Sequence, residues 1–183
     1  MKKLLLCAAI AVFTLSNVNA QENVIKVNPL AVLGGTDLVS YERVLGEHTS
    51  GIISAAIGGF KLGDIKYSSF GAGLQYRYYF DDVLDGWYGG AVVSYQNGKT
   101  EIEDGFFGGG SNDEEFDFTA IGGGLKVGHQ WVWDSGFSLD LNIGASYKSF
   151  DYDFTDGTST STQDLFKASG TLPTFGFGLG YAW

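Results

Sequence analysis

The chain has 183 residues, which is enough for one ordinary domain. Glycine accounts for 28 of them and aromatic residues for 15%, whereas there are 2 prolines and 1 cysteine. This glycine content argues against a helix bundle, because glycine destabilises a helix interior by about 1 kcal/mol relative to alanine. A hydrophobic content of 44% argues against a disordered chain, and a formal net charge of −10 argues against a nucleic-acid-binding protein.

The first residues predict a secretory signal peptide over residues 1–20. Lys2 and Lys3 form a basic segment, an apolar stretch follows them, and small residues precede the expected cleavage point. The apolar stretch is too short to span a membrane as a helix. Cys7 follows a leucine and not the small residue that a lipoprotein signal needs, so we expect no lipid anchor. The predicted mature domain covers 21–183 and contains no cysteine.

The remaining chain alternates large apolar residues with small or polar ones, which is the period of a β-strand with two unlike faces. The C-terminal stretch from Thr174 to Trp183 keeps this alternation to its last residue. We expect eight strands, over residues 24–34, 36–45, 51–62, 69–80, 87–102, 116–133, 137–154 and 172–183. The predicted fold class is all-β, an eight-stranded antiparallel up-and-down transmembrane β-barrel. Short turns that alternate with longer loops are typical of such barrels in the outer membrane of Gram-negative bacteria.

Aromatic residues cluster where the short turns are expected. Tryptophan and tyrosine rings favour the boundary between membrane and water, so these residues predict an aromatic girdle at one rim. The girdle set is Tyr78, Tyr79, Phe80, Trp87, Tyr88, Trp131, Trp133, Phe137, Tyr181 and Trp183. A second aromatic set lies toward the long-loop rim and consists of Tyr95, Tyr147, Phe150 and Phe175.

Three stretches carry a resemblance to known proteins: NVIKVNPLAVLGGTDLVSYERVL, GAGLQYRYYF and FGFGLGYAW. They resemble the small eight-stranded outer-membrane β-barrel proteins of the OmpA/OmpX-like class. More closely, the chain is similar to single-domain outer-membrane barrels whose function is unassigned. No peptidoglycan-binding domain follows Trp183, so we expect no wall-anchoring role.

The same resemblance implies a partner for the last strand. In such proteins the barrel assembly machinery recognises a final strand that ends in an aromatic residue. That role falls here on Phe175, Phe177, Leu179, Tyr181 and Trp183.

Charged residues occur on the predicted inner face of the strands. The alternation points five of them inward, together with Gln75, Gln130 and Asn142: they are Glu42, Arg77, Lys126, Asp140 and Lys148. Isolated charges in a dry interior are costly, so we expect them to pair. We expect Lys126 and Asp140, on adjacent strands, to lie within salt-bridge reach, directly or through one neighbour. A pore or proton path is one interpretation; a polar plug is favoured, because eight strands leave room only for side chains.

The residues that could carry catalysis or hold a metal do not form a convincing site. Neither His48 nor His129 shares the inner face on which Ser146 and Asp140 lie, so no acyl-transfer triad is predicted. The acidic run 112–115 offers oxygen ligands for Ca²⁺ but lacks the spacing of a dedicated site, and a solvated loop accounts for it better. We expect no enzymatic activity, no cofactor and no metal.

These observations favour a monomeric protein of the cell outer membrane with a filled polar interior. Its role would be structural or would lie in surface interaction, its partners being outer-membrane lipid and an extracellular ligand of the long loops over 105–115 and 155–171. The first alternative is a secreted lipocalin-like barrel that binds a lipid or small molecule, with apolar residues inside. The second is a membrane enzyme that trims acyl chains.

Overall fold

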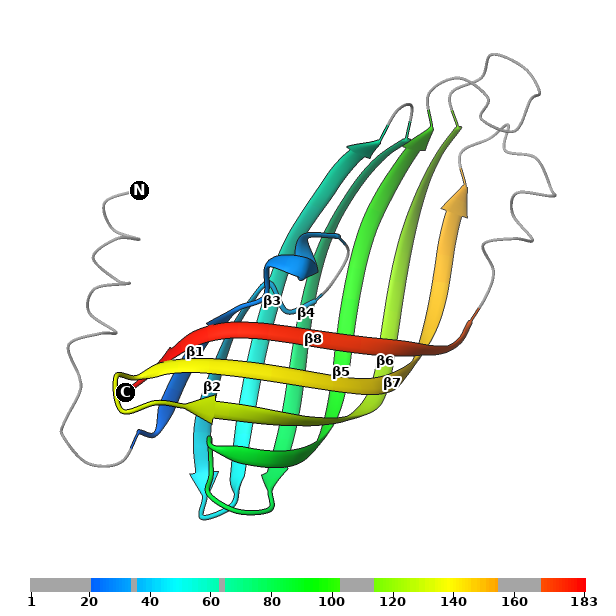
Figure 1. Ribbon diagram of the computed structural model, residues 1–183. Coiled ribbons are helices and arrows are strands. Elements are labelled where there is room, and N and C mark those ends of the chain that lie inside the picture. The colour runs from blue at the N-terminus through cyan, green and yellow to red at the C-terminus, as the bar shows by residue number, and fades with distance from the viewer. Residues whose placement is uncertain (1–20, 34–35, 63–64, 103–113, 155–168) are drawn as a thin grey trace.

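A computed structural model describes most of the chain, namely residues 21–33, 36–62, 65–102, 114–154 and 169–183 (Figure 1). The predicted signal peptide lies outside the described residues, as do the middle parts of both long loops. The acidic run over 112–115 lies partly outside them, and no side chain of that run is described.

Eight antiparallel strands close into one barrel in which each strand pairs with its neighbours in sequence and the last pairs with the first. The strands are β1 (Asn23–Val27), β2 (Val39–Gly46), β3 (Thr49–Leu62), β4 (Ile65–Tyr79), β5 (Gly86–Ile102), β6 (Glu114–Val132), β7 (Phe137–Phe154) and β8 (Gly170–Ala182). The predicted eight-stranded antiparallel up-and-down architecture is confirmed.

The two faces of the barrel wall follow the alternation of the sequence. In β7 the side chains of Ser138, Asp140 and Ser146 are buried, whereas those of Leu141 and Ile143 are exposed. The same division holds for most positions of the other strands, although a few large apolar residues such as Ile52 and Phe118 are buried on the inner face. Residues of one parity share one side of a strand, so each strand sends one row of side chains into the lumen.

The predicted first strand over 24–34 is wrong in its second half. β1 ends at Val27, and Pro29–Leu33 forms a short 3₁₀ helix, η1. β2 begins at Val39 and not at residue 36. Proline cannot donate a ladder hydrogen bond, and the apolar run that follows Pro29 does not alternate, so a compact helical turn replaces the strand. No helix in the described ranges has the length and apolar character that crossing a membrane would need.

The barrel wall is not equally tall all round (Figure 1). β1 has 5 residues and β2 has 8, whereas β6 has 19. The pairing of β8 with β1 stops at Leu179 opposite Val27. The pairing of β3 with β2 stops at Ala55 opposite Val39. Beyond those points β8 and β3 have no strand partner on the facing side among the described residues, and η1 contacts both of them there.

The short-turn end of the barrel is closed from within. Val24, Leu84 and Ala182 form a buried apolar cluster, against which Val44 and Val132 pack. Leu84 belongs to the turn between β4 and β5, and its backbone has a φ of 70°, in the left-handed region. The turn thereby places the side chain of Leu84, which is 2% exposed, beneath the lumen, where it forms part of an apolar floor.

Candidate functional site

Two cations and two anions meet in the lumen just above this floor. Lys26 comes from β1, Glu42 from β2, Arg77 from β4 and Asp140 from β7. All four are buried, and none is more than 4% exposed. Charges contributed by four different strands therefore converge at one level of the barrel.

Each cation contacts both anions. Lys26 Nζ lies 2.6 Å from Glu42 Oε2 and 2.8 Å from Asp140 Oδ2. Arg77 Nη1 lies 2.7 Å from Asp140 Oδ2 and 3.5 Å from Glu42 Oε2. The formal charges cancel, which is the condition under which buried ions are tolerated in a low-dielectric interior. We call this set of four residues the ion network.

Hydroxyl groups satisfy the remaining carboxylate oxygens. Tyr79 and Ser50 donate to Glu42 Oε1, over 2.8 and 2.5 Å. Tyr88 donates to Asp140 Oδ1 over 2.7 Å, and the guanidinium of Arg77 lies 3.9 Å from the centre of the Tyr88 ring. A buried network of this kind adds rigidity when its hydrogen-bonding groups are satisfied.

Gln130 connects the ion network to the floor. Its side-chain oxygen accepts from Lys26 Nζ at 2.8 Å and from Arg77 Nη1 at 3.0 Å. Its Nε2 donates to the backbone carbonyl of Leu84 over 2.9 Å. The turn that closes the barrel is therefore tied to the charges above it.

Glycine makes room for these long side chains in a narrow lumen. A Cβ placed on Gly180 would lie 2.4 Å from Ile25 O and 2.7 Å from Lys26 Cγ. A Cβ on Gly128 would lie 2.6 Å from the Tyr88 hydroxyl. All three distances are well inside van der Waals contact, so these two inner-face glycines are required by the packing around the ion network.

A second polar region lies farther from the floor. It encloses a cavity of about 40 Å³ that Arg77, Lys126, Asn142 and Asp37 help to line. Lys126 Nζ lies 4.0 Å from Asp37 Oδ2, and Lys148 Nζ donates to Gln96 Oε1 over 3.4 Å. This region is looser than the ion network.

The structure thus brings together three of the five predicted interior charges. Glu42, Arg77 and Asp140 share the ion network, while Lys126 and Lys148 lie in the upper polar region. Lys126 and Asp140, expected within salt-bridge reach directly or through one neighbour, form no direct salt bridge with each other. Asp140 binds Arg77 and Lys26 instead, because these side chains extend to its level, and Lys126 faces Asp37.

A protein-family model matches nearly the whole chain. The model described as "Protein of unknown function (DUF3575)" matches residues 4–183. The chain belongs to this family. No curated protein and no solved structure matches it significantly.

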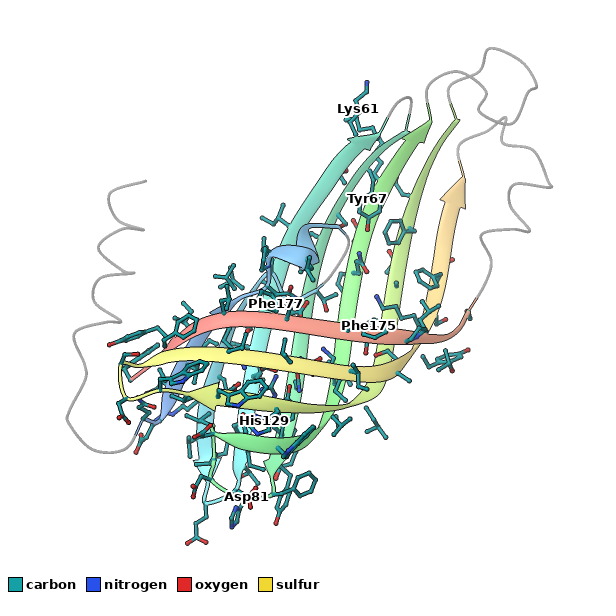
Figure 2. The ribbon with its side chains drawn as sticks, in the orientation of Figure 1. Lys61, Tyr67, Asp81, His129, Phe175 and Phe177 are labelled. Carbon is teal, nitrogen blue, oxygen red and sulfur yellow. The ribbon has the colours of Figure 1, made fainter. Side chains whose placement is uncertain are left out.

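In this DUF3575 member the predicted assembly residues lie on β8, at the seam where the barrel closes. Tyr181 and Leu179 pair with Ile25 and Val27 of β1. Phe175 and Phe177 lie farther along, where β8 is paired only with β7 among the described residues (Figure 2). Trp183 follows the strand, and its backbone N–H and C=O both bond to Asn23.

An apolar belt surrounds the outside of the DUF3575 barrel. In each long strand one outward residue marks the upper limit of the belt. These six residues are 43–77% exposed: Ile57, Phe70, Tyr95, Ile121, Tyr147 and Phe175. One step above this line the outward positions become glycine or polar in five of the six strands, namely Gly59, Ser68, Asn97, Thr119 and Ser149, and in β8 the next outward residue is Pro173, followed by Thr171. The belt therefore ends at a common level around most of the wall.

The lower limit of the belt is the aromatic rim, although two predicted members are inside the barrel. Phe80, Trp87 and Tyr181 are 45–61% exposed on the outer face. Tyr79 and Tyr88 are fully buried, because their parity places them with Arg77 in the lumen. In the second aromatic set, Phe150 likewise has inward parity and packs on Phe118, with ring centres 6.4 Å apart.

Lys26 was missing from the predicted interior charges, although the sequence carries a signal for it. Ile25 and Val27 flank it, and β1 turns these two apolar residues outward. The lysine between them must then point inward. Tyr79 differs, since the alternation already predicts it in the inner-face row with Gln75 and Arg77, and only its place near the rim put it in the girdle set as well.

Both histidines lie away from the inner face. His48 is in the turn between β2 and β3, with Nδ1 2.7 Å from the carbonyl oxygen of Asp81. His129 has outward parity in β6 and stacks on Trp131, with ring centres 4.2 Å apart. Ser146 and Asp140 point into the lumen, on the opposite side of the wall.

Proposed function

We propose that this DUF3575 protein is an integral outer-membrane β-barrel with a sealed polar interior, which serves a structural or surface-interaction role through its long loops. The observation that carries the proposal is the outer apolar belt, bounded by aromatic residues on one side and polar residues on the other. Such a surface in water would be a large exposed apolar patch.

The height of the belt suits a bilayer. In β6 it runs from Ile121 to Trp131, which is about 33 Å of strand at ~3.3 Å per residue. At the tilt of about 40° found in such barrels, this corresponds to roughly 25 Å along the axis, the usual height of the lipid-facing band. Arg43 points outward close to the aromatic rim, where a long basic side chain can reach the interface.

The arrangement of the interior favours a sealed barrel rather than a pore. Val24, Leu84 and Ala182 form the apolar floor, and the ion network fills the lumen directly above it. Eight-stranded barrels are just wide enough for side chains to fill. We therefore expect no steady ion conductance in planar bilayers.

The lipocalin-like alternative needs the opposite arrangement of side chains. A barrel of that type carries its apolar residues inside and its charges outside. Here Glu42 and Asp140 are buried in the lumen, whereas Leu125 is 71% exposed and Phe175 is 77% exposed on the outer face. This distribution favours lipid outside the barrel.

Cell fractionation tests the proposal. The protein should sediment with the outer membrane, resist alkaline carbonate extraction and need detergent to stay in solution. Unboiled protein should migrate differently from boiled protein on gels, as a folded barrel does. Recovery of the protein as a soluble periplasmic species would contradict the proposal.

A further inference from the structure

The strand pairing of the barrel wall is interrupted between β8 and β3, at the height of the apolar belt. β8 lacks a strand partner toward β1 from Gly178 to Gly170, and β3 lacks one toward β2 from Ala56 to Leu62, among the described residues. Phe175 and Ile57, on these two edges, still belong to the belt. An open strand edge exposed to lipid leaves backbone groups unsatisfied at several kcal/mol each, so the interruption needs a cover.

η1 supplies part of that cover. It contacts both β3 and β8, and in Figure 1 it lies beside β3 above the level of β8. Its residues Pro29–Leu33 are all apolar. Leu30 is 59% exposed, whereas Ala31 is 4% exposed, so the helix turns one side out and one side in. We call η1 and its described flanks, Asn28 and Thr36–Leu38, the plug.

Both prolines of the chain lie at this interruption. Pro29 begins η1, and Pro173 lies in the stretch of β8 that is paired on one side only. Proline is found in sheets at edges and poorly paired positions, because it cannot donate to the ladder. Neither proline can donate a ladder hydrogen bond, which fits the end of regular strand pairing at this place among the described residues.

The plug is held by a few polar contacts. Asn28 Nδ2 donates to Asp37 Oδ1 over 3.3 Å, and the backbone N–H of Asn28 donates to Leu38 O over 2.9 Å. These bonds tie the two flanks of the plug to each other. Its ion pair with the barrel joins Asp37 to Lys126, at 4.0 Å, which is the limit of a salt bridge.

The region behind the plug has an excess of positive charge. The ion network below it is neutral, with two cations and two anions. Above it, Lys126 and Lys148 both interact electrostatically with the carboxylate of Asp37, and Lys126 interacts in addition with Asp140 of the ion network. Displacement of Asp37 would remove the carboxylate that these two half-buried lysines share.

Unsatisfied polar atoms line the same cavity. Gln75 Nε2, Asn142 Oδ1 and Arg77 Nε have no hydrogen-bond partner among the described residues. Arg77 is 3% exposed, so its Nε cannot turn to bulk solvent. Buried polar groups without partners are rare and often mark a place where another molecule binds. Phe177 of β8 lines this cavity as well, beside Thr36 and Asp37.

From these observations we propose that the interruption between β3 and β8 is a lateral entrance, closed by the plug, through which the barrel binds an anionic amphiphile from the surrounding lipid. The phosphate or carboxylate head replaces Asp37 on Lys126 and Lys148. The hydrocarbon chain lies outside the wall, against Phe175 and Ile57. This inference rests on the proposed membrane location.

The test is isothermal titration of the refolded protein in dodecyl maltoside micelles with dodecyl phosphate. We expect one molecule bound per barrel. Inorganic phosphate and dodecyltrimethylammonium are the matched ligands, one lacking the chain and the other carrying the opposite charge, and we expect neither to bind. Equal binding of inorganic phosphate would show a free-anion site and overturn the amphiphile proposal.

Two substitutions separate the charges. Lys126→Gln should weaken binding of dodecyl phosphate by about tenfold or more, and Asp37→Asn should strengthen it by a similar factor, since it removes the competing carboxylate. Lys61→Gln, at the exposed end of β3, removes the same charge outside the cavity and should change nothing (Figure 2). Unchanged binding in both cavity variants would overturn the proposal.

A disulfide tests the entrance itself. A Cβ on Gly73 would lie 3.7 Å from Thr36 Oγ1, so cysteines at these two positions are within bridging range. Ser54→Ala makes room, since Ser54 Oγ lies 2.7 Å from that Cβ. The oxidised protein should lose binding and regain it on reduction. Binding that survives oxidation would contradict a lateral entrance.

The same samples keep the two proposals apart. Insertion into phospholipid vesicles is measured by the gel shift between unboiled and boiled protein. A protein that inserts but does not bind dodecyl phosphate would overturn the entrance alone. A protein that stays outside the vesicles would overturn the membrane location.

Discussion

The ammonium group of Lys26 lies 2.8 Å from the carboxylate of Asp140, which joins β1 to β7 across the intervening β8. The strand that closes the barrel is therefore held twice. Its backbone pairs with β1 and β7, and an ion pair behind it connects those two neighbours. The Lys26–Asp140 pair therefore both neutralises interior charge and connects the two strands on either side of β8.

The first prediction concerns the balance of the ion network. Lys26→Met removes one of two cations and leaves a buried carboxylate uncompensated, so it should lower the free energy of unfolding by about 3–5 kcal/mol. Adding Glu42→Gln restores neutrality and leaves the Arg77–Asp140 pair intact. The double variant should therefore be more stable than the sum of the two single effects indicates.

Urea unfolding in detergent, followed by the gel shift of the folded barrel, measures these differences. Lys61→Met is the control, since Lys61 is exposed at the far end of β3. Additive effects in the double-mutant cycle would refute the coupling.

The second prediction concerns the space that glycine leaves for Lys26. Gly180→Ala places a methyl group 2.4 Å from Ile25 O and should destabilise the barrel by about 1–3 kcal/mol, the usual range for overpacking. Gly123→Ala is the matched control, because its Cβ would point outward and lie 3.7 Å from its nearest neighbour, Val92 O. Equal stability of the two variants in urea would show that the seam between β1 and β8 tolerates the extra methyl.

The third prediction concerns the outer belt. Leu141→Arg places a charge within the belt and should reduce the stability of the barrel in phospholipid vesicles by about 2–4 kcal/mol. Ser149→Arg also points outward, on the same strand but above the belt, and should cost about 0–1 kcal/mol. If both substitutions had the same effect on folding into vesicles, the belt would not mark the bilayer.

The fourth prediction concerns Trp183. Trp183→Ala keeps the backbone bonds to Asn23 but removes the terminal ring. If the assembly machinery recognises that ring, the level of protein in the outer membrane should fall sharply, while purified protein still refolds in detergent. Trp133→Ala removes another rim indole and should leave the level unchanged. Equal levels of the two variants in the outer membrane would show that the ring of Trp183 serves only as a membrane anchor.

The sequence was sufficient for the strands whose alternation is unbroken. In β6 and β7, Leu125, Val127, Leu141 and Ile143 alternate with small or polar residues, and only one register puts them all outside. The stretch Pro29–Leu33 could not be assigned in this way. A short apolar run fits a buried strand and a helical turn equally well.

The sequence predicts the face on which an interior charged side chain lies better than it predicts the residue that the side chain contacts. Parity tells which face a side chain occupies, but it does not tell how far along the lumen the side chain reaches. Lys26 and Arg77 extend to the level of Asp140, and Lys126 finds Asp37, in a segment that was predicted to be strand. Such pairings depend on side-chain length and on the path of the plug.

The central claim is that the outer belt faces lipid, and a depth profile tests it most directly. Single cysteines carrying a bimane probe at Val93, Leu125 and Ile143 lie within the belt, whereas those at Lys99, Asp117 and Asp151 lie above it, and all six residues have outward parity. In vesicles that contain brominated phospholipids, the first three probes should be strongly quenched and the last three should not. Equal quenching at all six positions, or none at any, would contradict the account.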